Sequence, residues 1–272
     1  MFRDSEPVIE QSLESFANNY KNLKFIKFLH HSHQDHDEIK FHQFITKVEL
    51  TPNETDGRIF KHDSHPGGSS LFSKDIALVK CLGESVERVS TQSYFDKNQI
   101  YSTFKKLKQD AISPTSVSLF TKKQLTQKEY IKYRVTENSQ LSWTSGYSLF
   151  NLKEVLIPTQ LVYYSYKHKS EEGMFGPLIS TGAAGGGSLS AAILRGVYEV
   201  VERDSFMIFY LNKLPGKKIN LTSIADKRVK KALEVCGRYR LTWHAINITS
   251  DLEIPVIVSI LVDETGIGSA VS

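Results

Sequence analysis

The chain has 272 residues, of which 40% are hydrophobic and 24% are charged, an ordinary composition for a globular protein. Its net charge of +4, from 34 Lys and Arg against 30 Asp and Glu, is too small to indicate a nucleic-acid-binding protein. The longest apolar stretch, 254–262, is shorter than the ~20 residues that cross a bilayer, and the charged N-terminus argues against a secretory signal. We therefore expect a cytoplasmic protein without nucleic-acid or membrane partners, whose cysteines Cys81 and Cys236 are reduced, buried thiols.

In chain order, the predicted elements mix helices with strands. A helical pattern opens the chain at 6–25, before a His-rich stretch at 30–36 and a turn-rich connector at 58–70. A helix is predicted over 73–95 with Ser73 as its N-cap, followed by a polar, Lys-rich region with helices and loops over 91–140. Further along, the patterns predict strands at 147–150, 154–166 and 177–180, a charged helix after the Gly/Ala run at 180–188, a helix at 225–240, and strands at 241–250 and 254–264. This order predicts an α/β (mixed α+β) fold.

One charged pattern occurs twice, 115 residues apart, on the two long predicted helices. Each copy has two glutamates three residues apart and an arginine directly after the second, and each follows a serine cap by eleven residues. The first copy is Glu84, Glu87 and Arg88 after Ser73, and the second is Glu199, Glu202 and Arg203 after Ser188. Residues at i, i+3 and i+4 of a helix share one face, so each triplet projects together. Two surface salt-bridge clusters, worth less than ~1 kcal/mol each, are one interpretation of the pattern.

The apolar flanks of the second triplet favour a different interpretation. Residues 191–211 are apolar on almost every side of the predicted helix, so Glu199 and Glu202 are expected to be at least partly buried and to need counter-charges. Four carboxylates facing one cavity would repel one another unless cations were present, and Mg²⁺ prefers such oxygen ligands together with phosphates. We therefore predict a site for a metal-bound nucleotide between the two helices. Its metal ligands and catalytic carboxylates are Glu84, Glu87, Glu199 and Glu202, and Arg88 and Arg203 pair with carboxylates or phosphate oxygens.

The Gly/Ala run "STGAAGGGS" ends at a helix N-terminus, where unpaired N–H groups attract anions. It is neither a Walker A loop nor a dinucleotide fingerprint. Eleven helical residues span roughly 16 Å, so the run and the glutamates of the same helix are expected not to hold the same phosphate. The run would hold the nucleoside end, or it would meet the carboxylates of the partner helix.

A competing motif lies near the N-terminus. "HSHQDH" fits the H-x-H-x-D-H signature of metallo-β-lactamase-type hydrolases, in which His31, His33, Asp35 and His36 would ligate two metal ions. The following "DEIK" lacks the glycine pair usual in that family, and the first 30 residues are mainly helical in pattern. We keep the metallo-hydrolase as a minor alternative.

Several separated stretches resemble the YcaO proteins in order and spacing. They are "GGSSLFSKDIALVKCLGESVERVS", "IPTQLVY", "STGAAGGGSLSAAILRGVYEVVERDSF" and "INITSDLEIPVIVSILVDETG". The resemblance covers about 58–272 and implies a catalytic domain there, after an N-terminal helical and loop region at 1–57. It also implies a YcaO-type fold, in which two related Glu-bearing helices face a nucleotide site over β-sheet.

The resemblance implies an ATP- and Mg²⁺-dependent enzyme that activates a peptide backbone amide. A nucleophile adds to the amide carbonyl, and the resulting oxyanion is phosphorylated and expelled as phosphate. A neighbouring Cys, Ser or Thr side chain then gives an azoline ring (a thiazole or oxazole precursor), sulfide gives a thioamide, and an amine gives an amidine. The partners implied are a peptide or protein substrate, a leader-binding or thioamidation-type protein, and a second copy in a homodimer.

Residue by residue, the resemblance matches the four glutamates to Mg²⁺-binding carboxylates and the two arginines to neighbours of that site. The residues in nucleotide-binding stretches are Ser69, Ser70, Ser180, Gly186, Gly187 and Ser188. The chain departs from the family in lacking the lysine of a Gly-Lys-Gly sequence before the first helix, and it carries Gly187 and Ala191 where Asn and Glu are frequent. It ends at "TGIGSAVS", where the family continues into a third helix. We therefore expect a C-terminally incomplete domain, which is either a weak or inactive enzyme or a non-catalytic scaffold that binds a peptide or a partner protein.

Overall fold

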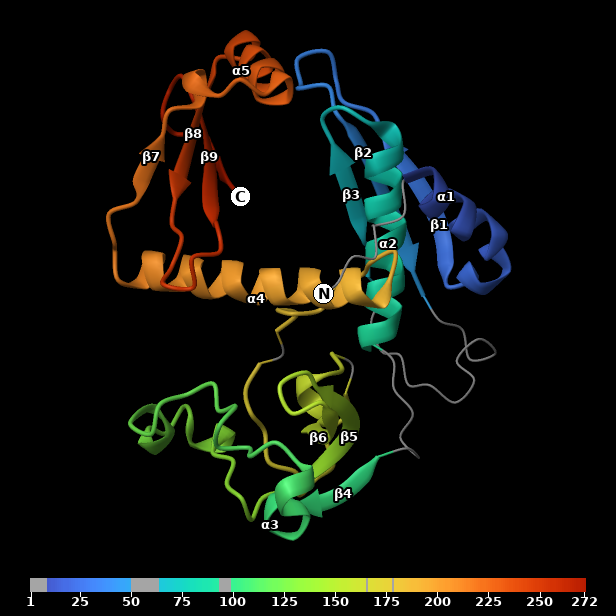
Figure 1. Cartoon of the computed structure of the whole chain (residues 1–272), viewed down its shortest axis with the longest axis vertical. Coiled ribbons are helices and arrows are strands. Elements are labelled where there is room, and N and C mark those ends of the chain that lie inside the picture. The colour runs from blue at the N-terminus through green and yellow to red at the C-terminus, as the bar shows by residue number, and fades with distance from the viewer. Residues whose placement is uncertain (1–8, 50–63, 93–98, 165, 178) are drawn as a thin grey trace.

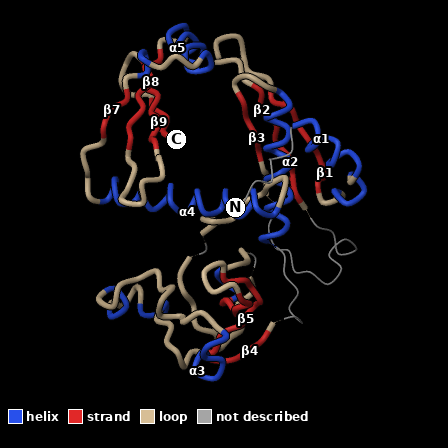
Figure 2. Tube along the Cα trace, viewed as in Figure 1, coloured by secondary structure: helices blue, strands red, loops and turns tan. Residues whose placement is uncertain are grey.

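The computed structural model describes residues 9–49, 64–92, 99–164, 166–177 and 179–272. Its strands form three separate antiparallel sheets, in the orders β1-β2-β3, β4-β5-β6 and β10-β9-β8-β7, which Figures 1 and 2 show as separate groups. The strands are β1 Ile26–Ser32, β2 His42–Val48, β3 Gly67–Ser70, β4 Ile100–Thr103, β5 Gln140–Ser148, β6 Lys153–Pro158, β7 Lys217–Ile219, β8 Leu241–Asn247, β9 Ile257–Asp263 and β10 Ser269–Val271. The α-helices are α1 Ile9–Asn18, α2 Lys74–Gln92, α3 Phe104–Leu107, α4 Leu189–Leu211 and α5 Lys227–Arg238. This arrangement confirms a mixed α+β fold.

Helix α2 packs on the first sheet through small side chains. Its residues Ala77, Cys81 and Ser85 recur every four positions, are fully buried, and lie against Phe44 and Thr46 of β2. Glycine makes this close packing possible in β3, because a Cβ on Gly68 would lie 2.2 Å from the Ala77 carbonyl oxygen. The face of α2 beside this buried stripe carries the first charged triplet.

Helix α4 packs on the third sheet along the chain, which contains β7–β10. Val201 is buried against Ile248, Val256 and Val258, with Phe209 packed at the edge of the same cluster. Figure 1 shows α4 extending from α2 at one end to this sheet at the other. The molecule thus contains two units in which a Glu-bearing helix covers an antiparallel sheet.

The β4–β6 sheet has its own small core. Leu141 and Trp143 of β5 are fully buried and pack with Val135 and Phe175. The backbone between β6 and α4 then returns from this sheet toward the two long helices (Figure 1).

Most of the helices predicted from the sequence are present. The helices expected at 73–95 and 225–240 are α2 and α5, with 93–95 lying outside the described residues, and the strands expected at 241–250 and 254–264 are β8 and β9. The strand expected over 154–166 ends at Pro158 and continues as a 3₁₀ turn at Thr159–Leu161, since proline has no N–H to extend the pairing. The described residues of 177–180 contain no strand.

The N-terminal region differs from the expectation that its first 30 residues are mainly helical. Among the described residues of this region, only Ile9–Asn18 forms an α-helix. Ile26–Ser32 is strand β1, because it pairs with β2, and the sequence patterns predicted neither strand. The boundary expected between residues 57 and 58 lies outside the described residues. The strands on either side of it, β2 and β3, pair with each other, with Phe44 opposite Gly68.

Both cysteines are free and buried, as the sequence predicted. Burial raises the pKa of the Cys81 thiol and of the Cys236 thiol, which keeps both protonated. None of the helices in the described part of the chain has the length and hydrophobicity that a bilayer span requires.

Candidate functional site

The two charged triplets have the same local geometry. In each, the arginine pairs with the glutamate four residues before it: Arg88 with Glu84 at 2.9 Å and Arg203 with Glu199 at 3.5 Å. The serine caps are also equivalent. The hydroxyl of Ser73 accepts the Ile76 N–H and that of Ser188 accepts the Ala191 N–H, both at 3.2 Å. The predicted correspondence of the two helices is therefore present in their caps and in their ion pairs.

Three of the four glutamates are each held by the backbone N–H of a glycine. Glu84 Oε2 accepts from Gly67 at 3.0 Å, where β3 begins. Glu199 Oε2 accepts from Gly182 at 3.1 Å, and Glu87 Oε2 accepts from Gly185 at 3.1 Å. Hydrogen bonds to an ionised acceptor are stronger than neutral ones, so these bonds fix the carboxylates in place.

The Gly/Ala run lies between the two helices. A Cβ on Gly185 would lie 3.1 Å from the carbonyl oxygen of Gly83 on α2, and one on Gly196 of α4 would lie 2.6 Å from that of Gly182. Gly182 has φ +92°, a conformation that glycine adopts readily. The run therefore fits between the helices because Gly185 allows its close contact with α2 and Gly196 allows its close contact with α4.

The run meets a carboxylate of the partner helix, which is one of the two predicted arrangements, but it also lies nearer the glutamates of its own helix than the helical span predicts. The cap Ser188 is indeed far from Glu199 along α4, but the run folds back beside the helix before the cap. Gly182 consequently reaches Glu199, 17 residues later, while Gly185 reaches Glu87 on the partner helix.

The charges of Arg88, Glu84 and Glu199 all act on the carboxyl of Glu87. Burial is the largest influence on the pKa of this carboxyl and raises it above its ordinary 4.5. Arg88 and the Gly185 N–H oppose the shift, while the nearby carboxylates Glu84 and Glu199 reinforce it. Burial is the largest single influence on the Arg88 guanidinium and lowers its pKa, but the hydrogen bonds to Glu84 and the negative charges of Glu84 and Glu87 together raise the net pKa. Glu84, Glu87 and Glu199 are thus close enough to act on one another.

Glu202 does not share this environment. Its side chain is exposed, contrary to the expectation of partial burial, because it lies on the side of α4 that turns away from Val201 and the sheet. Arg203 is likewise more exposed than its counterpart, with 58% of its side chain accessible against 28% for Arg88. In the second triplet, therefore, Glu199 contacts the Gly run, whereas Glu202 and Arg203 are exposed to solvent.

The donor set fits Mg²⁺, although the protein alone does not enclose an ion. Among the described residues, no three His, Cys, Asp or Glu side chains gather closely enough to hold a metal ion. Mg²⁺ is usually held by one or two carboxylates together with phosphate oxygens and water, so a complete protein cage is not required. Within the described part of the chain, the second oxygen of Glu87 has no hydrogen-bond partner, and it is a hard oxygen ligand of the required kind.

The residues predicted to contact the nucleotide occupy several places. The hydroxyl of Ser70 accepts the N–H groups of Phe72 and Ser73 and so shapes the turn before α2, and the Ser69 carbonyl accepts from Lys80. Gly186 packs against the first turn of α4, where a Cβ would lie 2.5 Å from the Ala192 nitrogen. The remaining members, Gly187 and Ser188, lie at the start of α4, and the Ser180 carbonyl accepts a hydrogen bond from Tyr164.

Sequence reasoning missed four contributors to this arrangement. Gly67, Gly182 and Gly185 act through their backbone N–H groups, and Tyr164 lies among the charged residues of both helices. The glycine-rich run itself was the available signal for two of the glycines. No pattern indicated Tyr164, because the surrounding stretch had been assigned to a strand.

The His-rich motif does not form the metal centre of a hydrolase. His31 ends β1 with its ring stacked on Phe44 at 4.5 Å, while His33 follows in a loop, with the two imidazole centroids 5.0 Å apart. Together with His42, they border a shallow hollow of about 240 Å³. His31, His33, Asp35 and His36 all lie within the described residues, in which no three potential ligand side chains gather closely enough to hold a metal ion. The structure therefore gives the metallo-hydrolase hypothesis no support.

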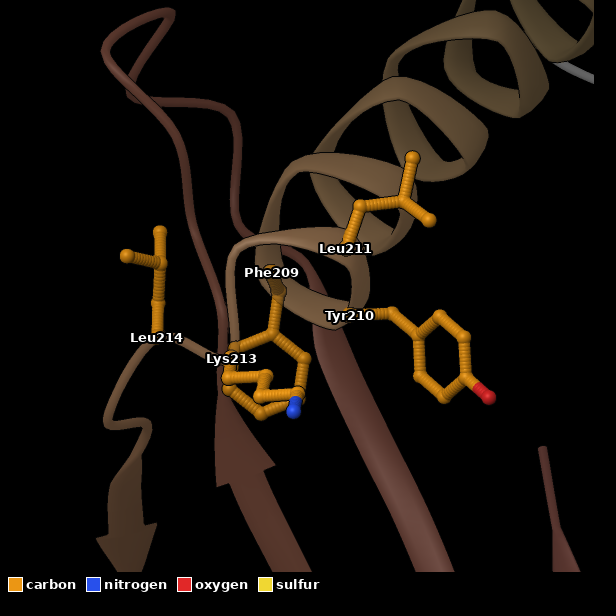
Figure 3. Close-up of a pocket in the computed structure, with 5 residues that line it drawn as sticks. All are labelled: Phe209, Tyr210, Leu211, Lys213 and Leu214. Carbon is orange, nitrogen blue, oxygen red and sulfur yellow. The ribbon is translucent and has the colours of Figure 1, made fainter.

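A larger hollow, of about 480 Å³, lies at the far end of α4 from the Gly run. Phe209, Tyr210, Leu211, Lys213 and Leu214 line it, and Figure 3 shows these side chains around the end of the helix. No glutamate or arginine of the two triplets borders it, so it is separate from the carboxylate site.

Comparisons with known proteins agree with this geometry. The family model described as YcaO cyclodehydratase, ATP- and Mg²⁺-binding, matches residues 71–271. An uncharacterized protein from the tfuA 3′ region of Rhizobium leguminosarum bv. trifolii is 26% identical over 124 residues, which are 44% of this chain and 29% of that protein.

Two solved structures share the fold. A heterocyclase in complex with substrate and cofactor superposes with a TM-score of 0.79 at 20% identity, covering 99% of this chain and 37% of that chain. YcaO from Methanopyrus kandleri, bound with AMPPCP and Mg²⁺, gives 0.63 at 14% identity, covering 97% and 62%. The chain thus spans well under half the length of the rhizobial relative and of the heterocyclase. Because the family model matches most of its residues, the chain belongs to the YcaO cyclodehydratase family.

Proposed function

We propose that the protein carrying this chain uses ATP and Mg²⁺ to activate a backbone amide of a ribosomally made peptide or protein. The observation that carries the proposal is the set of three carboxylates, Glu84, Glu87 and Glu199, each fixed by a glycine N–H between two equivalent helices. Bound ATP would supply the phosphoryl group that turns the amide oxygen into a leaving group.

The residues of the chain have distinct parts in this proposal. Glu87 and Glu199 would hold Mg²⁺ through oxygens not bonded to glycine, and the Arg88–Glu84 pair would keep a positive group beside the phosphates. Because burial raises the pKa of Glu87, its carboxyl binds a proton more readily without a cation and releases it when a cation binds. The N–H groups of the Gly run keep the two helices in a fixed relation.

The proposal names cyclodehydration as the reaction, in which a Cys, Ser or Thr side chain of the peptide attacks the preceding amide carbonyl and one water is lost. The family model is named for this reaction, and the structural neighbours include a heterocyclase. Thioamide or amidine formation would use the same activated amide with sulfide or an amine in place of the side chain. A separate leader-binding protein would serve to present the peptide, as the neighbours include the multi-subunit McbBCD synthetase complex.

The test is ATP consumption by the protein carrying this chain, with a peptide library containing Cys, Ser and Thr, followed by mass spectrometry. Cyclodehydration predicts Mg²⁺-dependent phosphate release coupled to the loss of one water per modified residue, and both should disappear in Glu199→Gln. Mass gain of sulfur for oxygen would assign thioamidation instead. ATP consumption that ignores every peptide would refute the proposal.

A non-catalytic scaffold is the second candidate. It is favoured by the exposure of Glu202 and by the finding that, among the described residues, no three potential ligands close around a metal ion. This candidate predicts peptide binding that is unaffected by ATP, Mg²⁺ or the Glu199→Gln substitution.

A further inference from the structure

Tyr164 stands at the junction of the two Glu-bearing helices and the Gly run. Its backbone N–H donates to the Thr91 carbonyl in the last turn of α2 at 2.9 Å. Its phenol hydroxyl donates to the Ser180 carbonyl, where the Gly run begins, at 3.1 Å. One residue thus connects the end of α2 to the start of the run that leads into α4.

Several charged groups of the site act on the Tyr164 hydroxyl. Burial, the largest influence, raises its pKa above the ordinary 10.0, Arg88 lowers it, and Glu87 and Glu199 raise it further. The phenol therefore stays protonated at neutral pH and remains a hydrogen-bond donor. Charges from both helices reach it, which places it beside the carboxylate site rather than in a peripheral loop.

The segment around Tyr164 is anchored on both sides. Thr91 donates its hydroxyl to the Glu87 carbonyl at 2.8 Å, within the same turn of α2 that holds the Tyr164 backbone. Downstream, the Tyr166 hydroxyl donates to the buried Glu172 at 2.5 Å, and Glu172 also accepts the Ser142 N–H of β5. A residue held this firmly can fix the position of the carbonyl to which it donates.

Side chains around the Gly run make four hydrogen bonds to its backbone. Tyr164 holds Ser180, Glu199 holds Gly182, Glu87 holds the Gly185 N–H, and Arg195 donates to the Gly185 carbonyl at 3.3 Å. Glycine-rich backbone loses more freedom on ordering than any other sequence, so each of these bonds has a large effect on where the run lies. We propose that Tyr164 is a positioning residue, whose hydroxyl fixes the Gly run so that Gly182 and Gly185 present their N–H groups to Glu199 and Glu87.

The inference rests on the proposed function for its consequence, since a displaced run would present the carboxylates to Mg²⁺ and nucleotide less well. The substitution Tyr164→Phe removes only the hydroxyl and keeps the ring and the backbone hydrogen bond to Thr91. Tyr147→Phe is the matched control, because Tyr147 lies on β5 with 57% of its surface exposed.

The first measurement is amide hydrogen exchange of residues 180–187 in the 272-residue chain without ligand. Loss of one hydrogen bond corresponds to an increase of roughly three- to tenfold in the exchange rates of the Gly182 and Gly185 amides in Tyr164→Phe. The second measurement is the affinity for a non-hydrolysable ATP analogue at varied Mg²⁺. It should weaken by a similar factor, with a higher Mg²⁺ concentration for half-saturation and an unchanged melting temperature, whereas Tyr147→Phe should match the parent.

The two measurements separate the possible failures. Unchanged exchange at Gly182 and Gly185 overturns the role of Tyr164 whether or not the chain binds nucleotide. Faster exchange with parental nucleotide affinity also overturns it, since the run would then be irrelevant to the site. A melting temperature that falls in step with the affinity would assign Tyr164 to stability alone. If the parent chain binds no nucleotide, the proposed function fails, and the exchange rates still decide whether Tyr164 fixes the run.

Discussion

The backbone N–H of Gly185 donates a 3.1 Å hydrogen bond to the carboxylate of Glu87, across 98 residues of sequence. This bond joins the Gly run before α4 to the charged face of α2. It also involves the carboxyl whose pKa is raised by burial and by two neighbouring carboxylates. Glu87 therefore both joins the Gly run to α2 and carries the carboxyl on which the neighbouring charges act.

Glu87 should make Mg²⁺ binding depend on pH. A cation competes with the proton on this carboxyl, so Mg²⁺ affinity should rise with pH from the ordinary value of 4.5 up through the raised pKa. In Glu87→Gln the affinity should be lower, and this part of its pH dependence should be absent. Calorimetric titration of Mg²⁺ with nucleotide at several weakly acidic pH values measures both. Equal pH dependence in parent and variant would contradict the assignment.

Without metal, the same carboxyl should affect stability in the opposite sense from a salt-bridged acid. A raised pKa in the folded state means that the contribution of Glu87 is fully present below pH 4.5 and is lost as pH rises through the folded pKa. Glu87→Gln should therefore gain stability relative to the parent as the pH approaches neutrality in metal-free buffer. Thermal unfolding across that range checks this, and a variant that loses stability with rising pH relative to the parent would refute it.

The fit of the Gly run predicts opposite effects for two Gly→Ala substitutions in helices. A Cβ on Gly196 would lie 2.6 Å from the Gly182 carbonyl oxygen, so Gly196→Ala should displace the run and cost about 1–3 kcal/mol. Gly83→Ala on α2 is the matched control, because its Cβ meets nothing within 4 Å and alanine favours a helix interior by about 0.5–1 kcal/mol. Denaturant unfolding measures both. Equal effects of the two substitutions would show that the run does not pack as described.

The equivalent caps predict equal losses at the two helices. Ser73→Ala and Ser188→Ala should each lower the free energy of unfolding by about 1 kcal/mol, since each removes one N-terminal acceptor. Ser90→Ala is the control, because the Ser90 hydroxyl is exposed and bonds only back to Val86 within α2. It should change stability by less than about 0.5 kcal/mol. A large loss at Ser90, or none at either cap, would contradict the correspondence.

The buried carboxylate Glu172 should be important for stability. It accepts hydrogen bonds from Ser142, Tyr166 and Lys169, so Glu172→Ala should cost roughly 2 kcal/mol or more. The exposed neighbour Glu171 offers the same substitution without these bonds and should be nearly neutral. Comparison of the two unfolding curves tests the prediction. A neutral Glu172→Ala would mean that the segment carrying Tyr164 is held by other contacts.

The sequence predicted the parts of the site that depend on local pattern. The spacing of Glu84, Glu87 and Arg88 and the cap at Ser73 are properties of one helix, and both recur on α4 as expected. It could not predict that Glu202 is exposed, because α4 is apolar on almost every side and its sequence does not identify the side that faces the sheet. The exposed Glu202 and the buried Val201 are adjacent in sequence, and only the packing of β8 and β9 distinguishes them.

The sequence also could not predict the backbone contacts between residues that are far apart in the chain. Strand β1 forms because it pairs with β2, and the donors Gly182 and Gly185 depend on how the run folds back beside α4. Helical spacing alone placed the run about 16 Å from the glutamates of its own helix, since that estimate assumed a run confined to the helix end. Tyr164 was assigned to a strand that in fact ends at Pro158. Each error arises where tertiary contacts decide the local conformation.

The most direct test of the account is calorimetric titration of a non-hydrolysable ATP analogue into the chain, with and without Mg²⁺. The parent should be compared with the double variant Glu87→Gln/Glu199→Gln, which keeps an amide oxygen to accept the Gly185 and Gly182 N–H groups but removes both charges. The account predicts Mg²⁺-dependent binding in the parent and its loss in a folded double variant. Binding of equal strength in both proteins, or no binding by the parent, would contradict it.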